Sequence, residues 1–176
     1  MKYVIVYLIK GKAKRYHEGL IKEVGPKFGE NYIIENPIPS HITLKSPFEI
    51  KSINKLEEIL KDFTKKYKAS KIQIDGFGNF KRFVSFLDTK FSKYTLQIQK
   101  DLIRELELID IKYNKFDKKW NPHVTIAYGN KPETFNQIWN YLKTLDSPHF
   151  DLKFDNITIL KKPRKYWKIY REFELK

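Results

Sequence analysis

The chain of 176 residues contains no cysteine, which excludes disulfide bonds, thiol catalysis and cysteine-ligated zinc. Long apolar runs are also missing. The longest, Tyr3–Ile9, is seven residues, whereas a helix needs about 20 to cross a membrane. No small-residue cleavage site follows this run, so we expect no signal peptide. These absences predict a soluble protein of a reducing compartment, cytoplasmic and without a membrane partner.

Acidic residues are comparatively few. Lys and Arg total 35 against 21 Asp and Glu, which gives a formal net charge of +14. Such an excess is typical of proteins with a polyanionic partner, most often nucleic acid; a lysine-rich surface that only keeps the protein soluble is the alternative. Hydrophobic residues make up 41% of the chain and aromatic residues 15%, so we expect a packed core rather than disorder.

Hydrophobic periodicity predicts helices alternating with strands, and no linker divides the chain. We therefore expect one domain over residues 1–176. A helix, a proline-marked turn, a strand that begins with His, a second helix and two strands occur in that order in each half. The helices are expected at 12–28, 53–67, 92–109 and 132–145. The strands are expected at 3–9, 41–50, 71–75, 83–87, 121–128, 150–160 and 167–175, with a hairpin turn at Lys81–Arg82 and a bulge or bend at Gly76 and Gly78.

Two tetrapeptides share the pattern His, apolar, Thr, apolar: His41-Ile42-Thr43-Leu44 and His123-Val124-Thr125-Ile126, which begin 82 residues apart. A strand points alternate side chains to opposite faces, so each His would share a face with its Thr. If the two strands lie side by side about a pseudo-twofold axis, two imidazoles and two hydroxyls converge on one spot. The alternative is that all four are ordinary residues on half-exposed strand faces.

Such a constellation suits acid and base chemistry at phosphorus. Histidine exchanges protons near neutral pH, so one neutral and one protonated imidazole make a base and an acid. Threonine hydroxyls can donate hydrogen bonds to the non-bridging phosphate oxygens. This in-line displacement needs no metal in principle, and we expect no cofactor.

At these residues the chain resembles the two-histidine phosphoesterases, which include the 2′-5′ RNA ligase-like proteins and RNA cyclic phosphodiesterases. Asn121-Pro122-His123, the chain length and the element order are similar too. The resemblance implies a bilobal α+β fold, in which two antiparallel sheets face a central cleft with helices outside. It also implies metal-independent cleavage of phosphodiester bonds, with catalytic roles for His41, Thr43, His123 and Thr125.

Four further residues are candidates for substrate binding. Lys45 continues the alternation of residues 41 and 43, and is either a phosphate ligand or one of many solvated lysines. Tyr128 stands where members of the family often have Arg, and it shares the face of His123 only if its strand departs from regular alternation. Lys119 and Trp120 precede the second motif and pair charge with an aromatic ring, as sites for single-stranded nucleic acid do; a loop with a packed Trp is the alternative.

Other features remain open at this stage. Lys161–Trp167 predicts a basic hairpin loop that either guides RNA or is simply charged. His17 and His149 lack a Thr partner and are expected at the surface. The leading hypothesis is a monomeric phosphodiesterase acting on 2′,3′-cyclic phosphate or 2′-5′ bonds in RNA ends or nucleotides. The alternative is a non-catalytic module that binds nucleic-acid ends or nucleotides in the same basic cleft.

Overall fold

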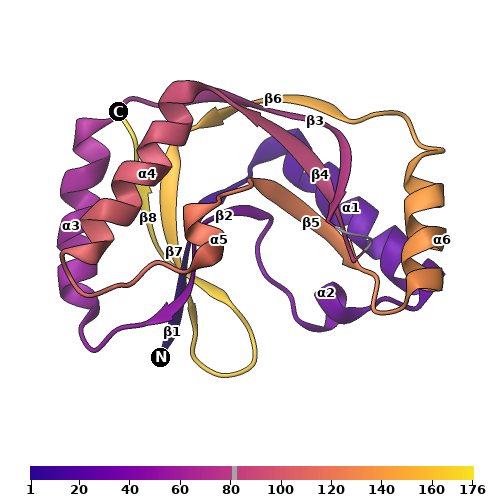
Figure 1. Cartoon of the computed structure of the whole chain (residues 1–176), viewed down its shortest axis with the longest axis horizontal. Coiled ribbons are helices and arrows are strands. Elements are labelled where there is room, and N and C mark those ends of the chain that lie inside the picture. The colour runs from indigo at the N-terminus through magenta and orange to yellow at the C-terminus, as the bar shows by residue number, and fades with distance from the viewer. Residues whose placement is uncertain (81–82) are drawn as a thin grey trace.

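Two four-stranded antiparallel sheets form the centre of the computed structural model, which describes residues 1–80 and 83–176 (Figure 1). One sheet has the order β2-β1-β7-β8, with β1 (Lys2–Leu8), β2 (His41–Glu49), β7 (Asn156–Lys162) and β8 (Lys168–Glu174). The other has the order β5-β4-β3-β6, with β5 (His123–Tyr128), β4 (Val84–Phe91), β3 (Ser70–Phe80) and β6 (His149–Phe154). The α+β class predicted from the sequence is confirmed.

The helices are α1 (Gly11–Phe28), α2 (Tyr32–Glu35), α3 (Ile53–Lys66), α4 (Lys93–Glu107), α5 (Lys115–Lys118) and α6 (Pro132–Leu142). The longer ones lie outside the sheets at the two ends of the molecule, with α3 and α4 at one end and α1 and α6 at the other (Figure 1). The long helix α1 ends at Gly29, whose φ of 69° suits glycine. No helix in the described ranges has the length and apolar character needed to cross a membrane.

The two halves of the chain repeat one arrangement. β1-α1-α2-β2-α3 is followed later by β4-α4-α5-β5-α6, and in each set the His-bearing strand is an edge strand paired antiparallel with the first strand. The two edge strands, β2 and β5, contact each other where the sheets meet. Helices of each half pack on the other half: α1 packs against β5 and α6, α4 packs against α3, and α5 packs against β2. Each half therefore supports the other half's motif strand.

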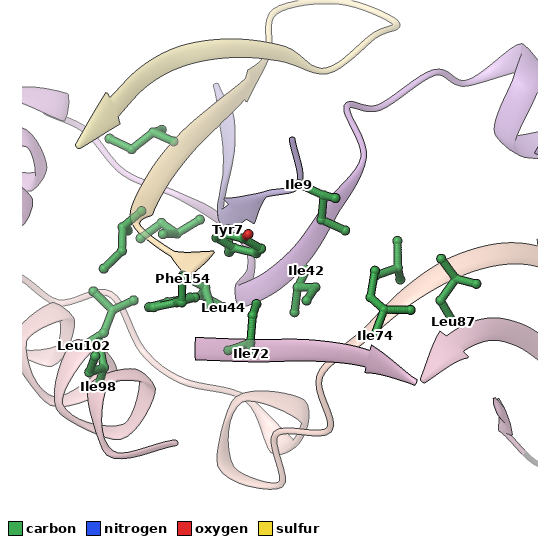
Figure 2. Packing of buried hydrophobic residues seen from close by; sticks show 14 of the residues in the cluster. Tyr7, Ile9, Ile42, Leu44, Ile72, Ile74, Leu87, Ile98, Leu102 and Phe154 are labelled. Atoms are coloured by element: carbon green, nitrogen blue, oxygen red, sulfur yellow. The ribbon is translucent and has the colours of Figure 1, made fainter. Parts of the chain in front are cut away.

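The main core joins side chains from both sheets and from the helices (Figure 2). The apolar residues of the two motifs, Ile42, Leu44, Val124 and Ile126, are at most 2% exposed. Burying such a side chain contributes about 1.5–3 kcal/mol. Burial of these four thus determines which face of each strand is left for chemistry.

The structure corrects the predicted strand at 150–160. It is two strands, β6 and β7, separated at Asp155, because β6 pairs with β3 in one sheet and β7 with β1 in the other. Asn156 stabilises the crossing: its side chain accepts a hydrogen bond from the amide of Leu8 and donates one to the carbonyl of Leu8.

Several boundaries also differ from the expectations. β3 runs on to Phe80 through the expected irregularity, where Gly76 has a φ of 89°. The four-residue helices α2 and α5 were not predicted, since one helical turn carries too little periodicity to be recognised. The predicted turn at Lys81–Arg82 lies outside the described residues.

Candidate active site

The two motif strands share a bulge as well as a sequence pattern. Thr43 pairs with Val6 and Lys45 with Ile5, so Leu44 is an extra residue in β2. In β5, Thr125 pairs with Phe86 and Ala127 with Ser85, and Ile126 is the corresponding extra residue. A bulge shifts the alternation of side chains by one position. As a result, Lys45 and Ala127 are buried together with the apolar residue before each of them.

All four motif residues line one cavity of about 250 Å³. The structure thus brings together His41, Thr43, His123 and Thr125, as the sequence predicts. His41 lies directly across from Leu8 and is anchored through Nδ1, which is 2.7 Å from the carbonyl oxygen of Pro39. His123 repeats this two residues after Asn121, with Nδ1 2.8 Å from the Asn121 carbonyl.

These anchors determine which imidazole nitrogen is available. A carbonyl oxygen only accepts hydrogen bonds, so Nδ1 carries the hydrogen in both His41 and His123. In the neutral ring Nε2 is then an unprotonated acceptor. Each histidine can therefore offer Nε2 to a ligand while its backbone bond fixes the orientation of the ring.

The surroundings of both imidazoles favour the neutral form. Burial lowers the pKa of His41 to about 4, against the opposing effect of the Pro39 bond, and charges on His17 and His123 lower it further. Burial also lowers the pKa of His123, whose ring packs 4.8 Å from the centroid of Phe80 and 5.1 Å from that of Phe86. An incoming phosphate would raise both pKa values, because its negative charge favours the imidazolium form.

A third histidine reaches the same place, which corrects the prediction that His17 is a surface residue. Its side chain lies on α1, is 5% exposed, and lines the cavity. Nδ1 is 2.8 Å from Oγ of Ser40 and Nε2 is 2.8 Å from the carbonyl oxygen of Thr125. Ala13, His17, Leu20 and Val24 are all buried, so the helical spacing of residue 17 from its apolar neighbours was the signal that could have found it. His149 is exposed, as predicted.

Lys45 is not in the cavity. It is 2% exposed, and its Nζ forms an ion pair with Oδ2 of Asp117 at 2.9 Å. Asp117 also accepts hydrogen bonds from the backbone amide and the hydroxyl of Ser46. The expectation that Lys45 shares the face of His41 is wrong, because the bulge at Leu44 turns the Lys45 side chain into the interior. There its ion pair with Asp117 links α5 to β2.

The other three candidates for substrate binding are placed differently from one another. Tyr128 lines the cavity, since the bulge in β5 returns it to the His123 face. Trp120 is not among the lining residues; its indole Nε1 donates to the carbonyl of Thr43 at 2.7 Å, and its ring packs on Phe91. Lys119 is exposed at the end of α5 and is likewise not among the lining residues.

Most of the rest of the cavity lining comes from two segments outside the motifs. The sequence leaves the role of one of them open and does not indicate the other. Of the predicted Lys161–Trp167 loop, Lys161 and Lys162 end β7 and residues 163–167 form the hairpin loop to β8; Lys162, Lys165 and Trp167 line the cavity. Tyr32 and Asn36 contribute from α2 and its end. None of the described lining residues is acidic. Two lysines without a nearby carboxylate in the lining favour an anionic ligand.

Two other features of the described chain bear on the choice of site. A larger cavity, about 510 Å³, lies beside Tyr7 and the start of α1, but it contains none of the motif residues. Within residues 1–80 and 83–176, no group of three or more His, Asp or Glu side chains is arranged to hold a metal ion. The absence of a metal cofactor stays a prediction for assays with a chelator.

Comparison with known proteins identifies the family. The model of the 2′-5′ RNA ligase superfamily matches residues 34–165, more than half of the chain. The fold is similar to the crystal structure of TT0787 from Thermus thermophilus, with a TM-score of 0.68, 14% identity, and 99% of this chain and 98% of that one covered. It is also similar to E. coli LigT complexed with 3′-AMP, with a TM-score of 0.63, 14% identity, and 99% and 97% covered. No curated protein matches the sequence.

Proposed function

The chain belongs to the 2′-5′ RNA ligase superfamily, and from that premise we propose that it is a phosphodiesterase using two histidines as acid and base. The proposed substrates are 2′,3′-cyclic phosphates or 2′-5′ phosphodiester bonds in RNA ends or nucleotides. The observation that carries the proposal is the pairing of His41 and His123, each with Nε2 left available, in one cavity whose described lining has no acidic residue. The complex of E. coli LigT with 3′-AMP is consistent with a nucleotide-sized ligand for this fold.

For a cyclic phosphate the proposed reaction is the addition of one water molecule. One imidazole Nε2 takes a proton from the water as its oxygen bonds to phosphorus. The other imidazolium gives its proton to the ribose oxygen as the bond from that oxygen to phosphorus breaks. The hydroxyls of Thr43 and Thr125 donate hydrogen bonds to the non-bridging oxygens, where negative charge increases in the transition state.

The environments of the two histidines favour a division of roles. Burial lowers the pKa of both histidines, and the shift is large enough at His41, to about 4, to make it the better candidate for the neutral base. His123 takes the acid role in this proposal. A substrate whose leaving group is p-nitrophenolate needs no acid, so it should restore activity to His123→Ala but not to His41→Ala. Equal restoration in both variants would contradict this division.

The direct test is a substrate panel in excess EDTA. It includes nucleoside 2′,3′-cyclic phosphates and 2′-5′ and 3′-5′ dinucleotides, with the position of the product phosphate assigned. His41→Ala and His123→Ala should each lower kcat/KM at least about 10²-fold, the usual value of a positioned acid or base. His149→Ala is the matched control, because this exposed histidine lies outside the cavity and should leave the rate unchanged. Full activity in either motif variant would refute the mechanism.

A non-catalytic binding module is the second candidate, favoured by the net charge of +14 and the two lysines in the cavity. Such a module would bind oligonucleotide ends with an affinity that falls steeply with salt, while every compound in the panel stays intact. The cytoplasmic location and the monomeric state stay predictions. Sedimentation of the purified chain would test the latter.

A further inference from the structure

Three aromatic side chains from separate segments meet at the edge of the cavity. Tyr128 of β5 is central: its ring lies 5.5 Å from that of Tyr32 in an edge-on arrangement and 6.1 Å from that of Phe83. Tyr32 is 56% exposed and Phe83 is 50% exposed. Large apolar rings this exposed usually mark a binding surface when they are grouped. We call Tyr32, Phe83 and Tyr128 the aromatic rim.

The cavity itself is small. Ligand pockets usually measure about 300–1,000 Å³, and this one measures about 250 Å³. A terminal ribose with its phosphate would fill much of it, so a neighbouring nucleotide must lie outside. Tyr32 and Tyr128 both line the cavity and also contact each other, so the rim begins where the cavity ends.

Charge and ring chemistry point to the same occupant. Lys162 and Lys165 line the cavity together with the two tyrosines, and Trp167 adds a third aromatic residue to the lining. Lysines beside exposed aromatic rings are the combination that binds single strands, with lysines on phosphates and rings stacked on bases. A protein partner is less well matched, because it would place its own apolar side chains among these lysines.

Resting on the proposed function, we propose that the aromatic rim is a subsite for the base of the nucleotide next to the reacting end. The preferred substrate is then an oligonucleotide end rather than a free mononucleotide. Stacking on one ring is worth about 1–3 kcal/mol, which is roughly a 5- to 150-fold effect on binding. The ratio of kcat/KM for a trinucleotide ending in a 2′,3′-cyclic phosphate to that for the corresponding cyclic mononucleotide should therefore be about tenfold or more.

The test compares this ratio among variants. Tyr32→Ala and Phe83→Ala should each lower the ratio at least about fivefold, whereas Tyr32→Phe, which keeps the ring, should preserve it. Phe116→Ala is the control, since Phe116 is 66% exposed on α5 and is not among the cavity residues. If the wild type opens both substrates equally well, or if the ratio does not change in the variants, the subsite is refuted while the proposed function stands. If neither substrate reacts, the proposed function fails; binding of a trinucleotide 3′-phosphate to the same variants then tests the rim alone.

A separate observation concerns His17. It is a buried imidazole that links both motifs: one nitrogen contacts Ser40, directly before His41, and the other contacts the carbonyl of Thr125. Gln99 occupies the corresponding seventh position of α4, and its Nε2 donates to the carbonyl of Leu44 at 3.1 Å. Each motif strand is thus held by a helix from the other half, but the hydrogen bonds of His17 extend to both motif segments.

The geometry assigns His17 as a positioning residue that sets the separation of the two catalytic imidazoles. A misplacement of about 1 Å can cost roughly 10²-fold in rate. His17→Leu should therefore lower kcat about 10- to 100-fold with little change in KM. His17→Gln should recover part of the loss, because an amide can still donate to Thr125, as Gln99 does to Leu44.

A double-mutant cycle that combines His17→Leu with Ser40→Ala separates a positioning role of His17 from a general loss of stability. If His17 acts through Ser40, the two substitutions affect kcat non-additively, and Ser40→Ala adds little to His17→Leu. All rates are compared at a temperature where circular dichroism shows each variant folded. A folded His17→Leu variant with kcat within twofold of the wild type, or strictly additive effects, would refute the assignment.

Discussion

Replacing Lys45 by Met should destabilise the protein strongly and leave substrate binding intact. Lys45 and Asp117 are each 2% exposed in the side chain, and their charged atoms are 2.9 Å apart. Removing one partner of a buried ion pair costs about 3–5 kcal/mol, because the other charge is left without its counter-ion. For a chain of this length, each kcal/mol lowers Tm by about 2–4 °C, so Tm should fall by roughly 6–20 °C.

The pH dependence gives this prediction a second readout. Burial acts to raise the pKa of Asp117, but hydrogen bonds from Ser46, Asn114 and Lys45 outweigh it, and the pKa is lowered from its ordinary value of 3.8. Asp117 therefore contributes stability that is present above that value and is lost as pH falls through the lowered native pKa. In Lys45→Met the unpaired carboxylate protonates more readily. The difference in stability between wild type and variant should consequently shrink below about pH 4.

Urea unfolding measures the change in stability, and steady-state kinetics at low temperature measure KM for the folded variant. A double variant with Asp117→Asn has no buried charge at this place and should regain part of the lost stability. A loss below about 1 kcal/mol would contradict the burial argument. A raised KM without any loss of stability would instead restore Lys45 as a substrate ligand.

Three further predictions concern the whole site and the whole chain. Burial lowers the pKa of His17, His41 and His123, so at mildly acidic pH the unfolded chain binds protons that the native state does not. The free energy of unfolding should therefore fall as pH decreases from about 6.5 towards 4. A free energy of unfolding in urea that does not change over this range would contradict these directions. Trp120→Phe removes the hydrogen bond to Thr43, so it should cost about 1 kcal/mol in stability and lower kcat severalfold; a rise in KM alone would mean that Trp120 touches substrate. Residues 1–176 should unfold in one cooperative transition if they form one two-lobed domain, and two separated transitions by calorimetry would refute that.

Local patterns in the sequence determined much of this protein. The repeated His-apolar-Thr-apolar tetrapeptides identified the strands, their buried faces and the four residues that meet in the cavity, because alternation is a property of any strand. The long helices followed from their apolar spacing, and the end of α1 at Gly29 followed from its need for positive φ.

Tertiary structure decided the features that depend on partners far away in the chain. The paired bulges exist only against β1 and β4, and they bury Lys45 while bringing Tyr128 to the cavity. The break at Asp155 arises because the chain passes from one sheet to the other. His17 reaches the site because α1 packs against β5 of the other half. The β7–β8 loop belongs to the same sheet as the motif strand β2, in which β1 lies between β2 and β7. A sequence determines which side chains can share a face, but only packing between distant segments decides which faces close around the same space.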